Sequence, residues 1–348
     1  MSSAFTIIEG FMAVTTTPLE RVPCNLCGAD DLETIYHARA DLERDPDLAD
    51  KFRASGDELL TQPLVRCRRC SLRFVSPRVA AGAMLDGYAA GADPMYVSQM
   101  PARVRTFART VRRLDALRPA RGRLLDIGTA AGAFLKAAAD AGWETTGIEP
   151  NAWLADWGRR EYGVTIHVGS IDSVALPPAG FDVVTLWDVI EHTPDPLHVL
   201  RQAHRLLVPG GVLVVNYPDI GSWIARLMGR KWPFLSSVHL YYFTRRTMRA
   251  ALDRAGFDTI EIRPHLQRLK LGYIASRGEV VSPGLSRAGV RVAAALGMSD
   301  LEVPYWLGQT FVAARARAGG APAPAADGGP AAASSTPPTR PAAGRRDR

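Results

Sequence analysis

The stretch RLLDIGTAAGAFL, residues 123–135, constrains the fold of this 348-residue chain more than any other segment. It begins as an apolar strand that includes Asp126, continues into glycine, alanine and threonine, and ends in the amphipathic pattern AFLKAAADAG. Residues with almost no side chain allow a tight turn and let a ligand approach the backbone. We therefore expect a buried strand, a ligand-binding turn and a helix, in that order.

The alternation of strand-like and helix-like segments continues to the end of the apolar part of the chain. The further strand-like segments are WETTGIEP, VTIHVG, FDVVTLWD, GGVLVVNYP, FDTIEIRPH and QTFVAARAR. Helical patterns separate most of them, among them AWLADWGRREYG, PLHVLRQAHRLL and TRRTMRAALDRAG. This order predicts an α/β fold with a doubly wound, mostly parallel, Rossmann-like sheet covered on both faces.

Two carboxylates are expected at the same edge of this sheet. Asp126 lies at the end of the first strand, and Glu149 ends the second, 21 residues after Gly128. Ligands of open α/β sheets bind outside the carboxyl ends of the strands, where a carboxylate can accept hydrogen bonds from both hydroxyls of a ribose. The pair predicts a nucleoside-containing cofactor. The alternatives are a helix-capping role for Asp126 and a solvated loop position for Glu149.

The glycine-rich loop does not have the G-x-G-x-x-G spacing of dinucleotide-binding folds. DIGTAAG instead resembles the D-x-G-x-G-x-G loop of class I S-adenosylmethionine-dependent methyltransferases, with Ala130 in place of the middle glycine. The resemblance continues in GIEPN, GSIDSVALPPAGFDVV, WDVIEHTPDP and HLYYFTRRTMRAALDRAGF. It covers residues 121–257 and a closing strand near Thr310, and it implies an enzyme that uses S-adenosylmethionine.

The resemblance also assigns residues to parts of the cofactor. It places Glu149 at the ribose, and the glycine-rich loop at the methionine moiety. A second loop would flank the adenine, and the residues after the fourth strand would close the pocket. The implied cofactor-binding residues are Asp126, Gly128, Thr129, Ala130, Gly132, Glu149, Pro150, Ser170, Ile171, Asp188 and Val189.

The only four cysteines form two C-x-x-C pairs, Cys24 with Cys27 and Cys67 with Cys70. In an intracellular chain this pattern favours a metal over disulfides. Two such turns supply four thiolates, which would form a closed, structural zinc site with no open position for chemistry. The alternative is four unrelated core thiols.

Histidine is the residue type expected to remove a proton from a methyl acceptor near neutral pH. His192 follows the fourth strand, and His239 lies in SVHLYYFT, which resembles the Glu-His-x-x-Tyr-Phe segment of zinc-containing sugar C-methyltransferases. In those enzymes this histidine is implicated as the base. Val238 replaces the glutamate, which removes the neighbour that would raise the basicity of the histidine. We predict His239 as the base and His192 as its rival, unless His192 only holds its loop.

The segments predict five regions. They are an extension over residues 1–17, a zinc-ribbon-like module over 18–80, a helical connector over 81–120, the methyltransferase domain over 121–317, and a disordered tail over 318–348, rich in alanine, proline, glycine and serine. In the connector, helical spacing ends at Pro119 and relates Val104, Phe107, Val111, Leu114 and Leu117. Four aromatic residues in flanking segments are predicted either to cover the site or to belong to the core: Tyr88, Tyr96, Trp223 and Trp232.

Charge and hydropathy argue against two classes of protein, those that bind nucleic acids and those that span a membrane. The net charge of +7 is spread along the chain, with +2 in the tail, which argues against a nucleic-acid partner. No window approaches the ~18 apolar residues of a membrane span, and we expect a cytoplasmic protein. The leading hypothesis is methylation of a small molecule, such as a sugar or a natural-product hydroxyl or carbon. The alternatives are an RNA methyltransferase that grips its substrate with the zinc module, and a non-enzymatic scaffold. No oligomeric state is predicted.

Overall fold

The computed structural model describes residues 19–38, 59–278 and 282–319. The predicted extension over residues 1–17 and nearly all of the predicted tail lie outside these residues. So does much of the segment between the two cysteine pairs, residues 39–58. The predictions for these regions stay predictions.

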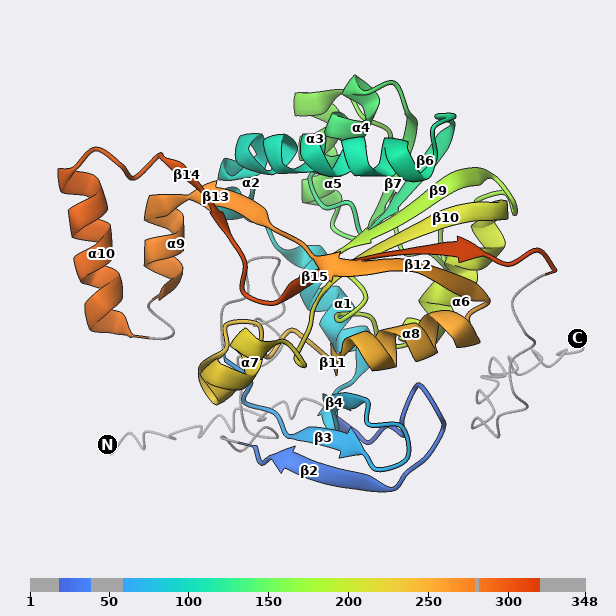
Figure 1. The fold of residues 1–348 in the computed structure, drawn as a ribbon, viewed down its shortest axis with the longest axis horizontal. Coiled ribbons are helices and arrows are strands. Elements are labelled where there is room, and N and C mark those ends of the chain that lie inside the picture. Colours follow the sequence, from blue (N-terminus) through green and yellow to red (C-terminus); the bar gives the residue numbers. More distant parts are fainter. Residues whose placement is uncertain (1–18, 39–58, 279–281, 320–348) are drawn as a thin grey trace, which may run out of the picture.

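A seven-stranded sheet forms the centre of the molecule, with the strand order β12-β15-β10-β9-β6-β7-β8 (Figure 1). The five strands from β10 to β8 are parallel, and β15 runs antiparallel to both of its neighbours. This arrangement confirms the predicted doubly wound, mostly parallel α/β sheet. The strands are β6 (Arg123–Ile127), β7 (Glu144–Glu149), β8 (Ile166–Val168), β9 (Phe181–Trp187), β10 (Leu207–Pro218), β12 (Phe257–Pro264) and β15 (Gln309–Ala316).

Helices cover both faces of this sheet, because successive side chains of a strand point to opposite faces. In β6, Leu124 belongs to the apolar cluster on one face, and Leu125 belongs to the cluster on the other. Figure 1 shows helices both above and below the sheet. The upper helices are α3 (Met100–Leu117), α4 (Ala133–Asp140) and α5 (Ala152–Tyr162), and the lower ones are α6 (Pro196–Leu206) and α8 (Arg245–Arg254).

A smaller four-stranded sheet, in the order β11-β4-β3-β2, carries the cysteines below the main sheet (Figure 1). Three of its strands come from the predicted zinc module, but the edge strand β11 comes from the end of the long loop after β10. The small sheet is therefore completed by a strand from the part of the chain that forms the main sheet. The strands are β2 (Leu32–Tyr36), β3 (Leu64–Cys67), β4 (Arg73–Val75) and β11 (Tyr241–Tyr242), and β1 (Leu19–Glu20) pairs separately with β5 (Arg78–Val79).

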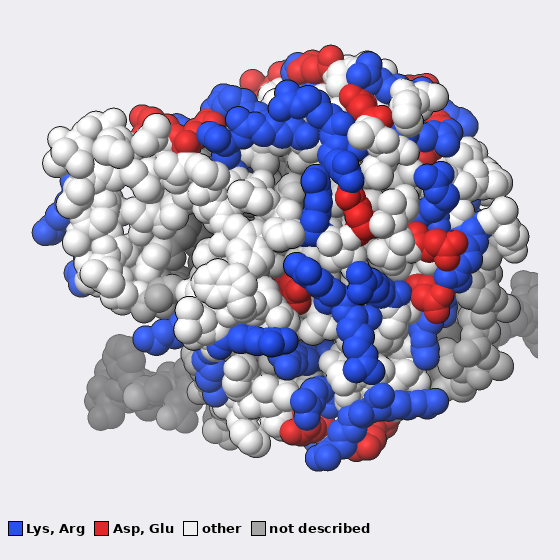
Figure 2. All heavy atoms as spheres, viewed as in Figure 1, with Lys and Arg blue, Asp and Glu red and all other residues white. Residues whose placement is uncertain are grey.

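The segment over residues 81–117 is helical and ends before Pro119, as the spacing predicts. Beyond β12, an extension for which the sequence indicated no elements projects from the body, and few charged side chains mark its helices in Figure 2. None of the described helices is long and apolar enough to cross a membrane. The remaining elements are α1 (Ala81–Ala90), α2 (Pro94–Ser98), α7 (Trp223–Met228), the 3₁₀ turn η3 (Gly229–Lys231), β13 (Gln267–Lys270), α9 (Leu271–Arg277), α10 (Pro283–Ala295) and β14 (Glu302–Tyr305).

Candidate active site

Asp126 lies at the carboxyl edge of β6 and is almost completely buried. The Thr185 hydroxyl donates a hydrogen bond of 2.6 Å to its Oδ1, and burial raises the pKa of Asp126 to about 7. The helix-capping alternative is wrong, because α4 begins after Gly132 and has no side-chain cap.

Glu149, at the end of β7, is fully buried beside the glycine-rich loop. Its carboxylate accepts hydrogen bonds from the backbone N–H groups of Ala130, at 2.7 Å, and Asn151, at 2.8 Å. Burial raises the pKa of Glu149 to about 7 although both amides favour the ionised form. The alternative of a solvated loop carboxylate is therefore wrong. The Tyr88 hydroxyl also hydrogen-bonds to this carboxylate. A carboxylate has about four acceptor sites, so the two amides and Tyr88 occupy three of them.

The glycine-rich loop turns through three residues with positive φ: Gly128, at 69°, Ala130, at 48°, and Gly132, at 74°. A Cβ added to Gly128 would lie 2.6 Å from the Val189 side chain, so this position requires glycine. Ala130, which stands where the family pattern has its middle glycine, adopts this left-handed conformation, for which alanine is less suited than glycine.

The segment with α1 and α2 lies over this loop. Tyr88 and Tyr96 pack in one apolar cluster with Ala130. The Asn151 side-chain amide donates to the carbonyl oxygens of Tyr88, at 2.8 Å, and of Gly91, at 2.7 Å. Glu149 has no exposed surface, and Tyr88 and Tyr96 lie over the loop beside it. Of the two alternatives for these aromatic residues, this packing favours a cover over the glycine-rich loop.

The other two aromatic residues do not cover the site. Trp232 is buried in the small cluster that joins the cysteine module to the loop after β10. Trp223 is exposed and lies 6.1 Å from Trp306, measured between the ring centroids.

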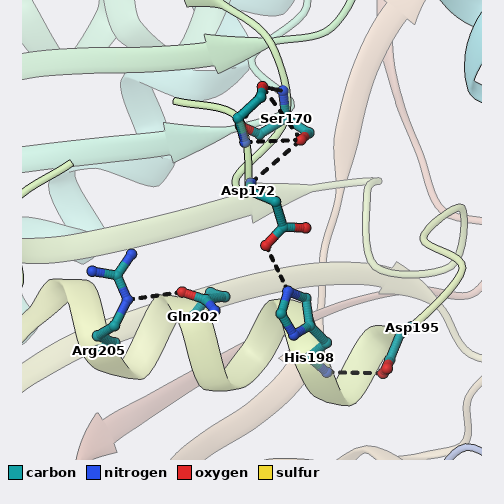
Figure 3. A network of polar contacts seen from close by, with 7 residues as sticks. Ser170, Asp172, Asp195, His198, Gln202 and Arg205 are labelled. Atoms are coloured by element: carbon teal, nitrogen blue, oxygen red, sulfur yellow. Dashed lines mark hydrogen bonds and ion pairs between the residues drawn. The ribbon is translucent and has the colours of Figure 1, made fainter. Parts of the chain in front are cut away.

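The loop predicted to flank the adenine is a compact hydrogen-bonded turn at the end of β8 (Figure 3). The Ser170 backbone N–H donates to the Ser173 hydroxyl at 2.9 Å, and Ile171 is buried against the main core. Asp172 lies 2.6 Å from His198 Nε2 at the surface of α6. His198 is thus a surface residue.

Asp188 directly follows β9 and adopts a positive φ of 52°. Its Oδ1 accepts a hydrogen bond of 2.6 Å from the Asn216 side chain, and burial raises its pKa to about 6 although nearby Arg103 opposes the change. A pocket opens here between α3, β9 and β13. Its lining includes Arg103, Phe107, Trp187, Asp188, Asn216 and His265.

His192 and His239 lie side by side, with ring centroids 4.6 Å apart and nearly perpendicular rings. Burial lowers the pKa of His192 to about 4 and the pKa of His239 well below 6.5. The Glu191 carboxylate joins them: one potential ligand atom from each of the three residues lies within 4.8 Å of the others. No role was predicted for Glu191, although it directly precedes the candidate base His192 in the sequence.

The presence of Val238 in place of a glutamate suggested that His239 has no carboxylate neighbour, and this inference is wrong. The carboxylate neighbour of His239 is not lost but comes from Glu191, on the loop after β9. The Glu191 backbone carbonyl accepts from the N–H groups of Leu240, at 2.8 Å, and Tyr241, at 3.1 Å, which fixes the His239 segment to that loop.

The four cysteines converge. Cys24 Sγ lies 3.4 Å from Cys70 Sγ, Cys27 Sγ lies 3.5 Å from Cys67 Sγ, and all four sulfurs lie within 4.8 Å of one another. Each turn ends in a residue with positive φ, Gly28 at 69° and Ser71 at 70°. None of the four forms a disulfide.

The comparisons with known proteins agree with this architecture. The model of a methyltransferase domain family matches residues 96–262. The ubiquinone biosynthesis O-methyltransferase of Cereibacter sphaeroides is 31% identical over 166 residues, which are 42% of this chain and 67% of that protein. The chain belongs to the class I S-adenosylmethionine-dependent methyltransferases.

Other similarities of the methyltransferase are shorter or more distant. The ubiquinone biosynthesis O-methyltransferase of Pseudomonas aeruginosa is 38% identical over 100 residues, 27% of this chain. The chain spans 43% of the length of that relative. A solved S-adenosylmethionine-dependent methyltransferase of Thermotoga maritima is 19% identical, with a TM-score of 0.43, and the match covers 63% of this chain and 91% of that one.

The cysteine turn of the methyltransferase contacts the loop that carries Glu191 and His192. Asn25, between the first two cysteines, donates to Asp195 Oδ1 at 2.7 Å, and its own Oδ1 accepts from the Leu197 N–H at 3.1 Å. Arg78 donates to the Pro194 carbonyl at 3.2 Å, as does the Tyr241 hydroxyl. The module thus supports the end of the loop that leads into α6.

Proposed function

We propose that this chain transfers a methyl group from S-adenosylmethionine to a hydroxyl of a small molecule. The observation that carries the proposal is the buried Glu149 carboxylate beside a glycine-rich loop, next to an acidic residue and two histidines at the same sheet edge. The cofactor supplies the methyl group as a sulfonium. Oxygen is favoured as the acceptor because the similar enzymes of Cereibacter and Pseudomonas are named O-methyltransferases.

The residues at the sheet edge fit S-adenosylmethionine. Glu149 would offer two acceptor sites to a ribose diol once the Tyr88 hydroxyl moves away from it. Gly128, Thr129 and Gly132 present backbone at close range for the methionine moiety. By the family resemblance, Pro150, Ser170 and Ile171 would flank the adenine. The same resemblance adds Asp126, Ala130, Asp188 and Val189 to the cofactor-binding residues.

The small pocket beside Asp188 is the candidate acceptor site. Its lining includes the rings of Phe107, Trp187 and His265, together with Arg103. Trp187 and Phe107 are 5.2 Å apart between ring centroids, so these rings are closely packed.

We also propose that the four cysteines hold one structural zinc ion. Their sulfurs are arranged closely enough for tetrahedral thiolate coordination, and burial raises the pKa of Cys70 to about 11. A cation would stabilise the thiolates against this burial. Elemental analysis of protein purified without a metal-binding tag is expected to give one zinc per chain, and folded protein without zinc would contradict the proposal.

Methyl transfer is tested by label incorporation from S-adenosylmethionine into hydroxylated ring compounds, sugar nucleotides and RNA in parallel. Label in a small molecule supports the proposal, whereas salt-sensitive binding and labelling of RNA would favour the alternative. Absence of cofactor binding in calorimetry would favour the scaffold, whose cofactor pocket is degenerate.

The proton acceptor is tested by two matched substitutions. If His239 removes a proton from the acceptor, His239→Gln lowers turnover by about 10²–10⁴-fold and leaves cofactor affinity unchanged. His192→Gln tests the rival assignment in the same assay. Full turnover in both variants would mean that alignment of the reactants accounts for catalysis.

A further inference from the structure

Glu191 is a buried acid without a compensating partner. Only 1% of the residue is exposed, and neither carboxylate oxygen has a hydrogen-bond partner among the described residues. An unpaired buried carboxylate is costly, and proteins normally pair such a group or use it to coordinate a metal. The neighbouring side chains therefore indicate whether Glu191 is paired with another group or coordinates a metal.

The two histidines beside Glu191 are held in one tautomer. His192 Nδ1 lies 2.9 Å from the Val238 carbonyl oxygen, and His239 Nδ1 lies 2.8 Å from the Phe234 carbonyl oxygen. A carbonyl only accepts, so each Nδ1 carries the hydrogen and donates it. Each Nε2 then keeps a lone pair. Metal-binding histidines show this same arrangement, in which the second nitrogen donates to a carbonyl or carboxylate.

The cluster brings together three electron-pair donors from the loop after β9 and the segment before β11. One carboxylate and two imidazoles within 4.8 Å of one another form a ligand set typical of transition-metal sites.

We propose that Glu191, His192 and His239 bind one divalent transition-metal cation, separate from the cysteine site. Three protein ligands leave coordination positions open, as in catalytic metal sites. The cation would lie between the loop after β9 and the segment before β11, which the Glu191 carbonyl already joins.

The metal site itself does not depend on methyl transfer, but its role rests on the proposed function. An acceptor hydroxyl bound at an open position would lose its proton more readily, because a bound cation lowers the pKa of an oxygen ligand. A nitrogen that binds the cation cannot accept a proton at the same time. With the cation bound, His239 would therefore act as a ligand and not as the base.

The test uses Co²⁺ as the probe and the full chain with its zinc content measured beforehand. After incubation with Co²⁺ and gel filtration, wild-type protein is expected to carry one Co²⁺ per chain with its zinc content unchanged. Glu191→Gln and His239→Gln are expected to weaken Co²⁺ binding at least tenfold in calorimetry while they retain the zinc.

The matched control is His198→Gln, because His198 also pairs with a carboxylate, that of Asp172, but at the surface (Figure 3). This variant should bind Co²⁺ like the wild type. Absence of bound Co²⁺ in the wild type, or equal affinity in folded Glu191→Gln, overturns the proposal. If Glu191→Gln does not fold, the proposal is tested by Co²⁺ binding to the wild type and to His239→Gln.

The two proposals fail separately. Methyl transfer without Co²⁺ binding would refute only the metal site. Co²⁺ binding that Glu191→Gln abolishes, in a protein that methylates no acceptor, would refute only the proposed function.

Discussion

Replacement of Glu149 by glutamine is the most direct test of the cofactor site. The wild-type carboxylate accepts two backbone N–H groups, and it would offer two acceptor sites to the ribose diol once the Tyr88 hydroxyl moves away from it. Glutamine keeps the shape, but it loses the charge and turns an NH₂ group toward one backbone N–H. The variant should therefore lose both charge-assisted hydrogen bonds to the ribose.

We expect S-adenosylmethionine to bind Glu149→Gln about 2–4 kcal/mol more weakly, the scale of lost hydrogen bonds to a charged group. This is roughly a 30- to 1000-fold higher dissociation constant, since each 1.4 kcal/mol is a factor of ten. Isothermal calorimetry measures the affinity, and a thermal melt shows whether the variant is folded.

The control is Glu144→Gln, at the exposed opposite end of the same strand. Its affinity for the cofactor should match that of the wild type. Unchanged affinity in folded Glu149→Gln would remove Glu149 from the cofactor site and refute the reasoning from the sheet edge.

Three further outcomes are expected. Ala130→Gly should stabilise the protein by about 0.5–1 kcal/mol in urea unfolding, because glycine tolerates the positive φ of 48°; a lower midpoint would contradict this. Cys67→Ser should lose zinc and melt at a lower temperature, with a smaller effect on turnover of the folded fraction; a variant that keeps zinc and stability would refute the cysteine site. Cofactor affinity should rise with pH up to about 7 and then level off, because Glu149, with its pKa raised to about 7, must be ionised to accept both hydroxyls, so each pH unit below 7 costs roughly tenfold. Glu149→Gln should abolish this dependence, and a flat wild-type profile would show that Glu149 does not control binding.

The fold was predictable because its signals are local and repeated. Most strands of the parallel part are followed by a helix, as β6 is by α4, β7 by α5 and β9 by α6, and this order alone indicates a doubly wound sheet. The positions of Asp126 and Glu149 at one edge follow from the same rule. Their near-complete burial does not, because it depends on the Tyr88 segment, which comes from another part of the chain.

Glu191 shows where prediction from the sequence ended. A glutamate beside a histidine on a loop is compatible with full exposure, and only the packing of the segment that carries His239 buries it. The sequence pointed to position 238 for a carboxylate, whereas the structure supplies one from 47 residues earlier in the chain, next to His192. The extension with β13, α9, α10 and β14 was missed because its strands have only four residues each, too few to show a period.

The position of β15 bears on how the chain folds during synthesis. This strand lies between β10 and β12, and it pairs with both over their length. Translation proceeds from the N-terminus, so β10 and β12 leave the ribosome first and cannot be joined until residues 309–316 follow. Until then both strands present open edges, which are the places where strands of other chains can add. A stalled or truncated chain that stops before residue 309 would therefore need a chaperone at those edges, even though every residue of the cofactor loop and of both cysteine pairs is already made.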